Sequence, residues 1–422
     1  MNFSVIRKFA DKLKKRPLLL FGIIHAILLL AVSANLDYVV GNCGVERRLA
    51  VELLDGNLPY SDVFTEYPPL AVLFFVFPGC FCHLQPCYSL LFALQIFLLD
   101  LLVLYLLGKF ARRLNLSIWK VYTVATVSLV AIGLMMTGRY DLLPAALVLL
   151  AIYTFVNGHN KTAWAILGLG MMAKLYPAII VPLFAIYLLR YRQYRKIIEG
   201  GLSFLTVVLV FSLPWLILDA GGYWEMWSYH LERGLHIESS YGSWMLVGQL
   251  LGWTHTTGQL SYGSWNLSSP LADSLAGAST YITFVLLLAA YALYAYRLWL
   301  QTDDREPAQM SGGQVALLLR SALLVVVVML LTGKVFSVQF IIWLYPLLLL
   351  VITRWCYLPA MLFVLVAAIT QVIYPWNYLD LELVKPYAVI LMALRNLLLV
   401  ALAVVLALPL RSPPVAEEKA LP

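Results

Sequence analysis

Apolar runs of about 20 residues recur along this chain, with short polar corners between them. A run of that length, coiled as a helix, crosses a hydrocarbon layer roughly 30 Å thick. Strands of a membrane barrel would instead alternate apolar and polar positions. The pattern therefore predicts an all-α polytopic membrane protein. We expect about 12 transmembrane helices, at residues 17–34, 86–107, 118–137, 142–157, 162–173, 176–190, 201–218, 275–299, 315–332, 335–353, 357–374 and 387–409.

Two stretches depart from this regular pattern. Residues 68–81 are apolar but short, and a full span there would reverse every later loop, so we expect a helix that enters the outer leaflet without crossing. The run at 162–173 ends early, before Lys174 and Pro177. Short, broken membrane helices usually line a cavity, because their freed backbone groups need water or protein partners.

Composition and charge agree with a membrane protein and orient it. The 422 residues are 62% hydrophobic and only 12% charged, and the mean hydropathy is +0.85. Most of the 29 lysines and arginines fall on one side of the predicted spans, in "RKFADKLKKR", "KFARR", "RYRQYRK" and the tail "RSPPVAEEKALP". Positively charged loops face the cytoplasm. We therefore expect both termini to be cytoplasmic in a plasma membrane, and the net charge of +7 requires no nucleic-acid partner.

These spans define the predicted domain organisation. Residues 1–410 form a single integral-membrane domain, with the first apolar run kept as an uncleaved anchor, and 411–422 form a disordered cytoplasmic tail. Two long loops face outward, at 35–85 and 219–274. Polar residues that could carry chemistry are concentrated on this outer side.

The cysteines carry little information about function. Cys80, Cys82 and Cys87 lie close together in "CFCHLQPC", inside an apolar segment with a single histidine. A zinc site would need four well-spaced donors. We therefore expect packing or a disulfide here rather than a metal site.

Three outer corners each place a cation where an apolar helix ends. Arg139 lies in "GRYD", Lys174 in "AKLYP" and Lys334 in "TGKVFS". Such residues can simply extend to the membrane interface. As a set, on the side where cations are scarce, they suit an anionic group such as the phosphate of a lipid.

The first outer loop combines a helix with a rigid connection. In "GVERRLAVELLDG", Val45, Leu49 and Leu53 share one helical face, and Glu46 falls among the polar positions. This spacing predicts an amphipathic helix on the membrane surface that ends at Gly56. The prolines of "NLPYSDVFTEYPP" then disfavour helix and predict a tyrosine-lined strap over a cavity.

Asp37 precedes this helix, at the exit of the first span. A carboxylate there, partly removed from water, can serve as a general base toward a hydroxyl. An interfacial or helix-capping aspartate would occupy the same position, and the residues alone leave both readings open.

Four segments together resemble the GT-C superfamily of membrane glycosyltransferases, most closely glycosyltransferase family 87. They are "LDYVVGNCGVERRLAVELLDGNLPYSDVFTEYPPLAVL", "GRYDLLPAALVLLAIYTF", "GLGMMAKLYPAIIVPL" and "GKVFSVQFIIWLYPLL", and "YHLERGLHIESSYGSW" is added to them. Each segment is weak alone, whereas the ordered set is specific. That family contains mannosyltransferases that use polyprenyl-phosphate mannose to build glycolipids of the cell envelope, and related arabinofuranosyltransferases.

The resemblance implies a GT-C fold, an inverting sugar transfer and a role for several residues. Asp37 matches the catalytic base, which would activate a lipid or glycan acceptor hydroxyl toward a polyprenyl-phosphate-linked sugar. The partners would be these two substrates and membrane lipids. Asp37 is followed by Tyr38 rather than by a second acid, so a metal-independent reaction is expected. The candidates for the donor phosphate are Lys174, Lys334 and Arg139. The candidates for the sugar and acceptor pocket are Tyr38, Glu66, Tyr67, Asp141, Arg233, His236, Glu238 and Gln339.

Two other functions fit parts of the pattern. A flippase or transporter of a lipid-linked sugar would also need basic contacts and broken helices, but alternating access calls for polar sites open to both faces, and here the polar loops lie on one side. An O-antigen ligase or polymerase would face outward too, but relies on external arginines and histidine rather than on an aspartate at the end of the first span. Glycosyl transfer is the reading that the sequence favours.

Overall fold

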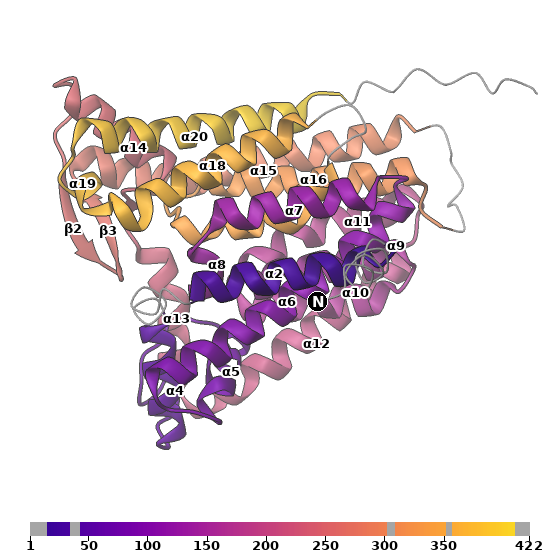
Figure 1. The fold of residues 1–422 in the computed structure, drawn as a ribbon, viewed down its shortest axis with the longest axis horizontal. Coiled ribbons are helices and arrows are strands. Elements are labelled where there is room, and N and C mark those ends of the chain that lie inside the picture. Colours follow the sequence, from indigo (N-terminus) through magenta and orange to yellow (C-terminus); the bar gives the residue numbers. More distant parts are fainter. Residues whose placement is uncertain (1–14, 34–42, 302–308, 352–356, 410–422) are drawn as a thin grey trace, which may run out of the picture.

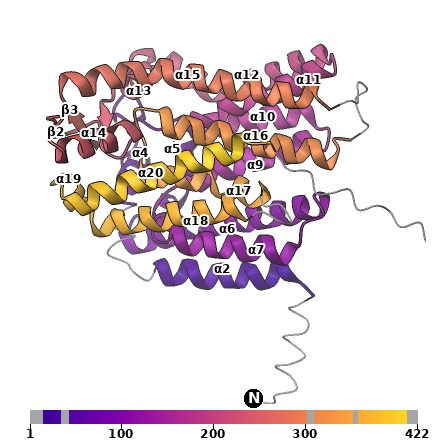
Figure 2. The same ribbon diagram turned by 90° about the horizontal axis from the view of Figure 1, so that it is seen from above.

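A bundle of helices forms most of the molecule, and they run side by side along its long axis (Figure 1). The computed structural model describes residues 15–33, 43–301, 309–351 and 357–409. Turned by 90°, the bundle shows α2 and α15 on opposite sides of it (Figure 2). The prediction of a helical membrane protein is confirmed within these ranges.

Six helical segments are long and apolar enough to cross a membrane, judged by length and composition. They are α6 (Gln85–Arg113), α12 (Tyr194–Leu218), α15 (Pro270–Trp299), α16 (Gly312–Thr332), α18 (Leu358–Gln371) with its continuation η3 (Val372–Trp376), and α20 (Pro386–Ala407).

Shorter helices fill the remaining predicted spans. They are α2 (Pro17–Ser33), α7 (Ile118–Ile132), α8 (Met135–Gly138), α9 (Leu142–Val156), α10 (Asn160–Ala173), η1 (Tyr176–Ile180), α11 (Val181–Arg190), η2 (Val338–Trp343) and α17 (Tyr345–Val351). Every predicted span thus contains helix, while the number of helices that cross the membrane stays a prediction.

Two of the predicted spans are broken rather than continuous. The helix expected over 118–137 stops at Ile132, because Gly133 adopts a positive φ of 59° that an α-helix cannot contain. The span expected over 335–353 begins as the 3-10 turn η2, and α17 starts only at Tyr345, next to Pro346. Both breaks place irregular backbone inside protein, where it can be satisfied.

The helix α5 (Pro69–Gly79) corresponds to the short apolar segment at 68–81. Its 11 residues extend roughly 16 Å, about half the thickness of the hydrocarbon layer. Length alone therefore prevents α5 from crossing, and a helix that enters without crossing stays the prediction for it.

The remaining elements gather at one end of the bundle (Figure 1). They are α4 (Gly44–Leu54), α13 (Ala220–Glu232), β1 (Leu235–His236), α14 (Ser240–Leu250), β2 (Thr257–Ser261), β3 (Ser264–Ser268) and α19 (Tyr378–Glu382). The strands form an antiparallel sheet in the order β1-β3-β2, with Leu235 opposite Leu267 and Gly258 opposite Leu267 on the other side. This small sheet departs from the all-α prediction.

Local sequence explains where the helices at this end begin. Asp219 accepts a hydrogen bond from the Gly222 amide, and Ser239 accepts one from Gly242, so each caps a helix start. Ser269 caps α15 in the same way. These caps fix the directions in which α13, α14 and α15 leave the loops.

The helix predicted at 44–56 is present as α4, and its burial pattern differs from an apolar–polar division at one residue. Glu46 and Leu49 are buried, with Glu46 only 1% exposed, whereas Val45 is exposed. An exposed Val45 leaves the membrane-facing side of this helix a prediction. The burial of Glu46 was not predicted.

Charged groups inside the bundle have partners. His25 of α2 contacts the Asp100 carboxylate of α6 at 2.6 Å, and the Tyr345 hydroxyl donates to the other Asp100 oxygen at 3.1 Å. Arg320 of α16 donates to the carbonyls of Val405 and Leu406, which end α20. Pairing of this kind is what a low-dielectric interior requires.

Candidate functional site

A cavity of about 940 Å³ lies at the end of the bundle that carries the loops. Six stretches that lie far apart in the sequence contribute to its wall, so no single local motif predicts the cavity. These stretches are 64–68, 139–140, 174–176, 229–238, 260–265 and 329–343, and α19 and its neighbours add Tyr374, Tyr378 and Glu382.

The structure brings most of the sequence-predicted site residues to this one cavity. The residues that line it are Glu66, Tyr67, Arg139, Lys174, Arg233, His236, Glu238, Lys334 and Gln339. Asp141 lies directly behind the wall, in contact with Lys174. Asp37 and Tyr38 lie outside the described residues, so their placement is not part of this geometry.

Lys174 stands at the break between α10 and η1, where Pro177 prevents the helix from continuing. Its ammonium donates to Asp141 Oδ1 at 2.6 Å. Burial lowers the pKa of Lys174, and the Asp141 carboxylate opposes that shift. The same Asp141 oxygen accepts from the Trp343 indole at 2.7 Å, so a single carboxylate fixes both side chains.

Aromatic rings surround this lysine. The Lys174 nitrogen lies 4.7 Å from the Tyr140 ring centre, 4.9 Å from that of Phe340 and 5.2 Å from that of Trp343. Trp343 also stacks on Tyr176 with 4.1 Å between ring centres. A cation among ring faces is held by the negative potential of those faces.

Arg139 ends the short helix α8 and faces an acid that the sequence reading did not select. Glu46 is the carboxylate with the largest electrostatic effect on Arg139. Burial raises the pKa of Glu46 to about 7, and Arg139 opposes that shift. A glutamate at a polar position of an amphipathic helix gives no signal in the sequence that it will be buried.

Arg233 and Lys334 belong to two loops that are hydrogen-bonded to each other. The Lys334 ammonium donates to the Leu231 carbonyl at 2.6 Å, and the Lys334 carbonyl accepts from the His236 amide at 2.9 Å. The Arg233 guanidinium donates to Ser264 Oγ at 2.9 Å. Burial lowers the pKa of both cations, and the charge of Arg233 adds to the shift at Lys334.

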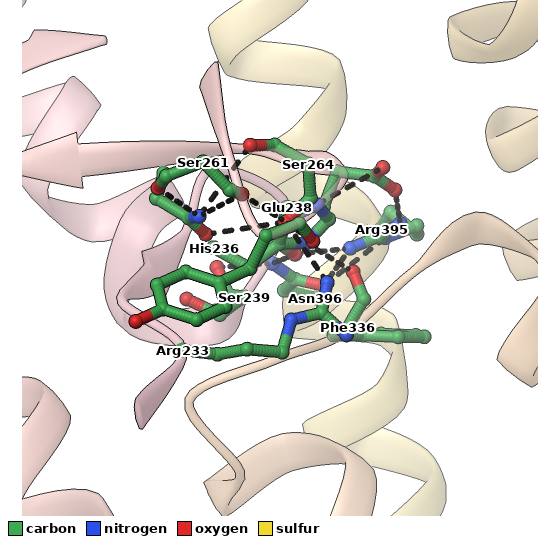
Figure 3. A network of polar contacts seen from close by, with 11 residues as sticks. Arg233, His236, Glu238, Ser239, Ser261, Ser264, Phe336, Arg395 and Asn396 are labelled. Atoms are coloured by element: carbon green, nitrogen blue, oxygen red, sulfur yellow. Dashed lines mark hydrogen bonds and ion pairs between the residues drawn. The ribbon is translucent and has the colours of Figure 1, made fainter. Parts of the chain in front are cut away.

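Glu238 and Ser239 are held by hydrogen bonds from helix α20 (Figure 3). Arg395 of α20 donates to the Glu238 carboxylate at 3.2 Å and to its carbonyl at 2.5 Å, and its guanidinium lies over the Phe336 ring. Asn396 donates to Ser243 Oγ. Burial raises the pKa of Glu238 to about 7, against the effect of Arg395.

The imidazole of His236 has a defined tautomer. Its Nδ1 lies 2.8 Å from the Phe336 carbonyl, which can only accept, so Nδ1 carries the hydrogen and Nε2 keeps a lone pair. Nε2 lies 4.0 Å from Glu238, too far for a hydrogen bond. Burial lowers the pKa of His236 to about 3, so the ring is neutral at pH 7.

The strap that follows α4 closes another side of the cavity. Tyr60 donates to the Tyr67 carbonyl at 2.6 Å, and the His230 ring donates to the Glu66 carbonyl at 3.0 Å. Burial lowers the pKa of His230 to about 4. These backbone contacts give the predicted strap its fixed path, with Glu66 and Tyr67 at the cavity wall.

Of the two roles predicted for the clustered cysteines, packing or a disulfide, the structure shows a disulfide. Cys82 and Cys87 are paired, and Cys43 and Cys80 are free. Within the described ranges no three His, Cys, Asp or Glu side chains group as metal ligands would.

The comparison with known families identifies the family of the chain. The model for glycosyltransferase family 87 matches residues 64–326, a stretch that includes Glu66, Arg139, Lys174, Arg233 and His236. No individual curated protein matches the chain. With more than half of its length matched, the chain belongs to glycosyltransferase family 87.

Proposed function

We propose that this glycosyltransferase transfers a sugar, most simply mannose, from a polyprenyl-phosphate donor to a hydroxyl of a lipid or glycan acceptor. The observation that carries the proposal is the cavity of about 940 Å³, which four cations from separate loops line: Arg139, Lys174, Arg233 and Lys334. A lipid phosphate is an anion that this wall suits, because charged donors bind phosphate strongly.

The reaction follows from the leaving group. The acceptor oxygen attacks the anomeric carbon, the bond from that carbon to the phosphate oxygen breaks, and the phosphate leaves with the electron pair. Asp37 takes the acceptor proton, and in-line attack inverts the anomeric configuration. Cations at the cavity wall stabilise the negative charge that develops on the phosphate. No metal takes part in this proposal, because Tyr38 follows Asp37 where a second acid would be needed.

Two observations support Asp37 as the base. It belongs to the segment that joins α2 to α4, and Val45 of α4 lines the cavity. Two of the described carboxylates are also engaged elsewhere. Asp141 is bonded to Lys174 and Trp343, and Glu238 to Arg395.

The proposed orientation puts the cavity on the extracytoplasmic side of a plasma membrane, with both termini in the cytoplasm. The corners at the other end of the bundle carry the arginines Arg112, Arg113 and Arg190, as cytoplasmic corners do. The Cys82–Cys87 disulfide joins the first turn of α6 to the loop before it, and disulfides persist in oxidising compartments.

The polar groups of the cavity wall support a sugar as the transferred group, and the family resemblance supports mannose. Neutral hydrogen-bonding groups such as His236 and Gln339 lie beside charged ones at the cavity, and buried polar groups of this kind discriminate hydroxyl patterns.

The test uses the purified protein in lipid vesicles. It is incubated with radiolabelled polyprenyl-phosphate mannose and a lipid extract of its source membranes. Wild type should move label to a new product, and Asp37→Asn should lower the rate by roughly 100- to 10,000-fold, the usual contribution of a general base. Asp55→Asn changes an exposed carboxylate beyond α4 and is the matched control. Transfer by Asp37→Asn at the wild-type rate would show that another residue is the base.

A further inference from the structure

The four cavity cations differ in how their charge is compensated. Lys174 has the Asp141 carboxylate at 2.6 Å, inside a ring of aromatic side chains. Glu46 is the carboxylate with the largest electrostatic effect on Arg139. Lys174 therefore already has a carboxylate of the protein in direct contact.

Arg233 and Lys334 lie side by side without such a partner. Lys334 bonds to Leu231 through its ammonium and to His236 through its carbonyl, so it is tied to the chain on both sides of Arg233. Among the ion pairs of the described residues, none includes Arg233 or Lys334. The Arg233 guanidinium lies over the Tyr229 ring, 5.9 Å from the ring centre, and donates to Ser264, and neither contact supplies a carboxylate.

Both side chains keep hydrogen-bond donors for a ligand. An ammonium has three donors, and Lys334 uses one of them on Leu231. Arg233 uses one terminal nitrogen on Ser264, and a guanidinium carries five N–H donors in all. Both residues line the cavity. Two adjacent cations repel each other, and an anion held between them offsets that repulsion.

A structural role also exists for Lys334. Leu231 lies in the last turn of α13, whose carbonyls have no partner inside the helix, so the ammonium caps that end. Capping explains one hydrogen bond of Lys334. It does not explain Arg233, whose contacts with Ser264 and Tyr229 leave terminal donors for a ligand.

We propose that Arg233 and Lys334 together bind the phosphate group of a membrane lipid, and that Lys174, held by Asp141, is not its main ligand. This assignment rests on the proposed function for its choice of phosphate. Two lipids could supply that group, namely the polyprenyl-phosphate donor and a phospholipid acceptor.

Binding to the purified full-length protein in detergent tests the assignment with three probes. Polyprenyl phosphate and phosphatidylinositol carry the two kinds of lipid phosphate, and polyprenol carries none. Arg233→Gln and Lys334→Gln should each lower the affinity for the phosphate lipid by about 10- to 100-fold, the usual effect of losing a hydrogen bond to a charged group. The affinity for polyprenol should stay unchanged. Arg233→Lys and Lys334→Arg should recover part of the loss. The probe that responds identifies the source of the phosphate.

Matched controls separate binding from folding and from the other cations. Arg48→Gln and Lys385→Gln remove a cation that does not line the cavity and should bind like wild type. The double variant Lys174→Gln, Asp141→Asn removes the Lys174–Asp141 ion pair without leaving an unpaired charge, and it should lose less affinity for the phosphate lipid than Arg233→Gln or Lys334→Gln. If capping is the whole role of Lys334, Lys334→Gln will lower the thermal unfolding midpoint without changing affinity for either phosphate lipid.

Three outcomes would overturn the assignment. They are unchanged affinity in both Arg233→Gln and Lys334→Gln, an equal loss in the Lys174, Asp141 double variant, and a wild type that binds neither phosphate lipid. Failure of the proposed function looks different. In that case the phosphate lipid binds through Arg233 and Lys334, but label from polyprenyl-phosphate mannose never reaches an acceptor.

Discussion

Asp141 is the residue on which the inner wall of the cavity depends. Its Oδ1 accepts from Lys174 and from Trp343, and the carboxylate is only 1% exposed. Its Oδ2 is buried without a hydrogen-bond partner. A carboxylate so placed is tolerated because the lysine lies against it, so the pair is stable only as a pair.

Removing one partner of this pair should therefore lower the free energy of unfolding more than removing both partners. Lys174→Met should lower the free energy of unfolding by about 3–5 kcal/mol, since it leaves Asp141 as an unpaired buried charge. Adding Asp141→Asn to it should recover part of the loss. Denaturant unfolding of the single and double variants in detergent measures the coupling. Additive losses in the double variant would contradict a paired role.

Glu46 should make stability depend on pH. Burial raises its pKa from 4.5 to about 7. Between these values the folded protein keeps a proton that the unfolded chain releases, so the stability that Glu46 contributes is present below pH 4.5 and lost as pH rises to 7. Glu46→Gln should thus gain stability relative to wild type over that range.

The comparison of thermal unfolding midpoints across pH 4.5 to 7 tests this prediction. Taking the difference between variant and wild type cancels the opposite effects of His230 and His236, whose lowered pKa values favour folding as pH rises. Glu52→Gln, an exposed glutamate of the same helix, is the control and should give a flat difference. A flat difference for Glu46→Gln as well would show that Glu46 titrates normally.

The elements around the cavity meet through close backbone contacts. At α13, a Cβ added to Gly222 would lie 1.7 Å from the Tyr60 carbonyl oxygen of the strap. Tyr60 also packs its ring against Tyr223 and Trp215. The strap and α13 therefore fit together only because position 222 has no side chain.

Gly222→Ala should force these two elements apart. Overpacking of this kind costs typically about 1–3 kcal/mol and moves backbone. Because Glu66 at the end of the strap is bonded to His230 of α13, we expect weaker donor binding as well as a lower unfolding midpoint. Gly221→Ala is the matched control, since its Cβ would lie 3.4 Å from the nearest atom, Asp219 Oδ1. Equal behaviour of the two alanine variants would contradict the contact.

Helix boundaries were predictable wherever the cause was local. Hydrophobic length located both ends of α10 and α16 closely, and the end of α12 but not its start, which lies at Tyr194 rather than at 201. The breaks at Gly133 and at η2 were not foreseen. Each depends on neighbouring helices that accept irregular backbone, and such neighbours are invisible in a hydropathy pattern.

At the scale of the molecule, all the predicted outer loops that the structure describes converge on one end of the bundle (Figure 1). A small second core there joins Leu246 of α14 and Leu267 of β3 to Val389 of α20. The buried Arg395–Glu238 contact connects the same parts. The loop assembly is therefore built onto the transmembrane helices rather than suspended above them.

Orientation is the prediction that belongs to this scale. In a background with Cys80 and Cys356 changed to serine, Asp62→Cys lies at the cavity end and Arg195→Cys at the other, both on exposed residues. A membrane-impermeant thiol reagent added to intact cells should modify the first and spare the second until the cells are opened. The reverse pattern would place the cavity in the cytoplasm.

The sequence by itself determined the helical membrane class, the approximate spans and the family, because hydrophobic length, charge bias and ordered motifs are local properties. It also selected cavity residues correctly at helix corners, since corners on one face of a bundle are brought together by the bundle itself. Only the tertiary structure decided which charges meet. Glu238 and Arg395 are 157 positions apart in the sequence, and Asp141 and Trp343 are 202 positions apart. Glu46 is buried although it falls among the polar positions of its helix. Such pairings depend on packing between distant segments, and no local pattern encodes them.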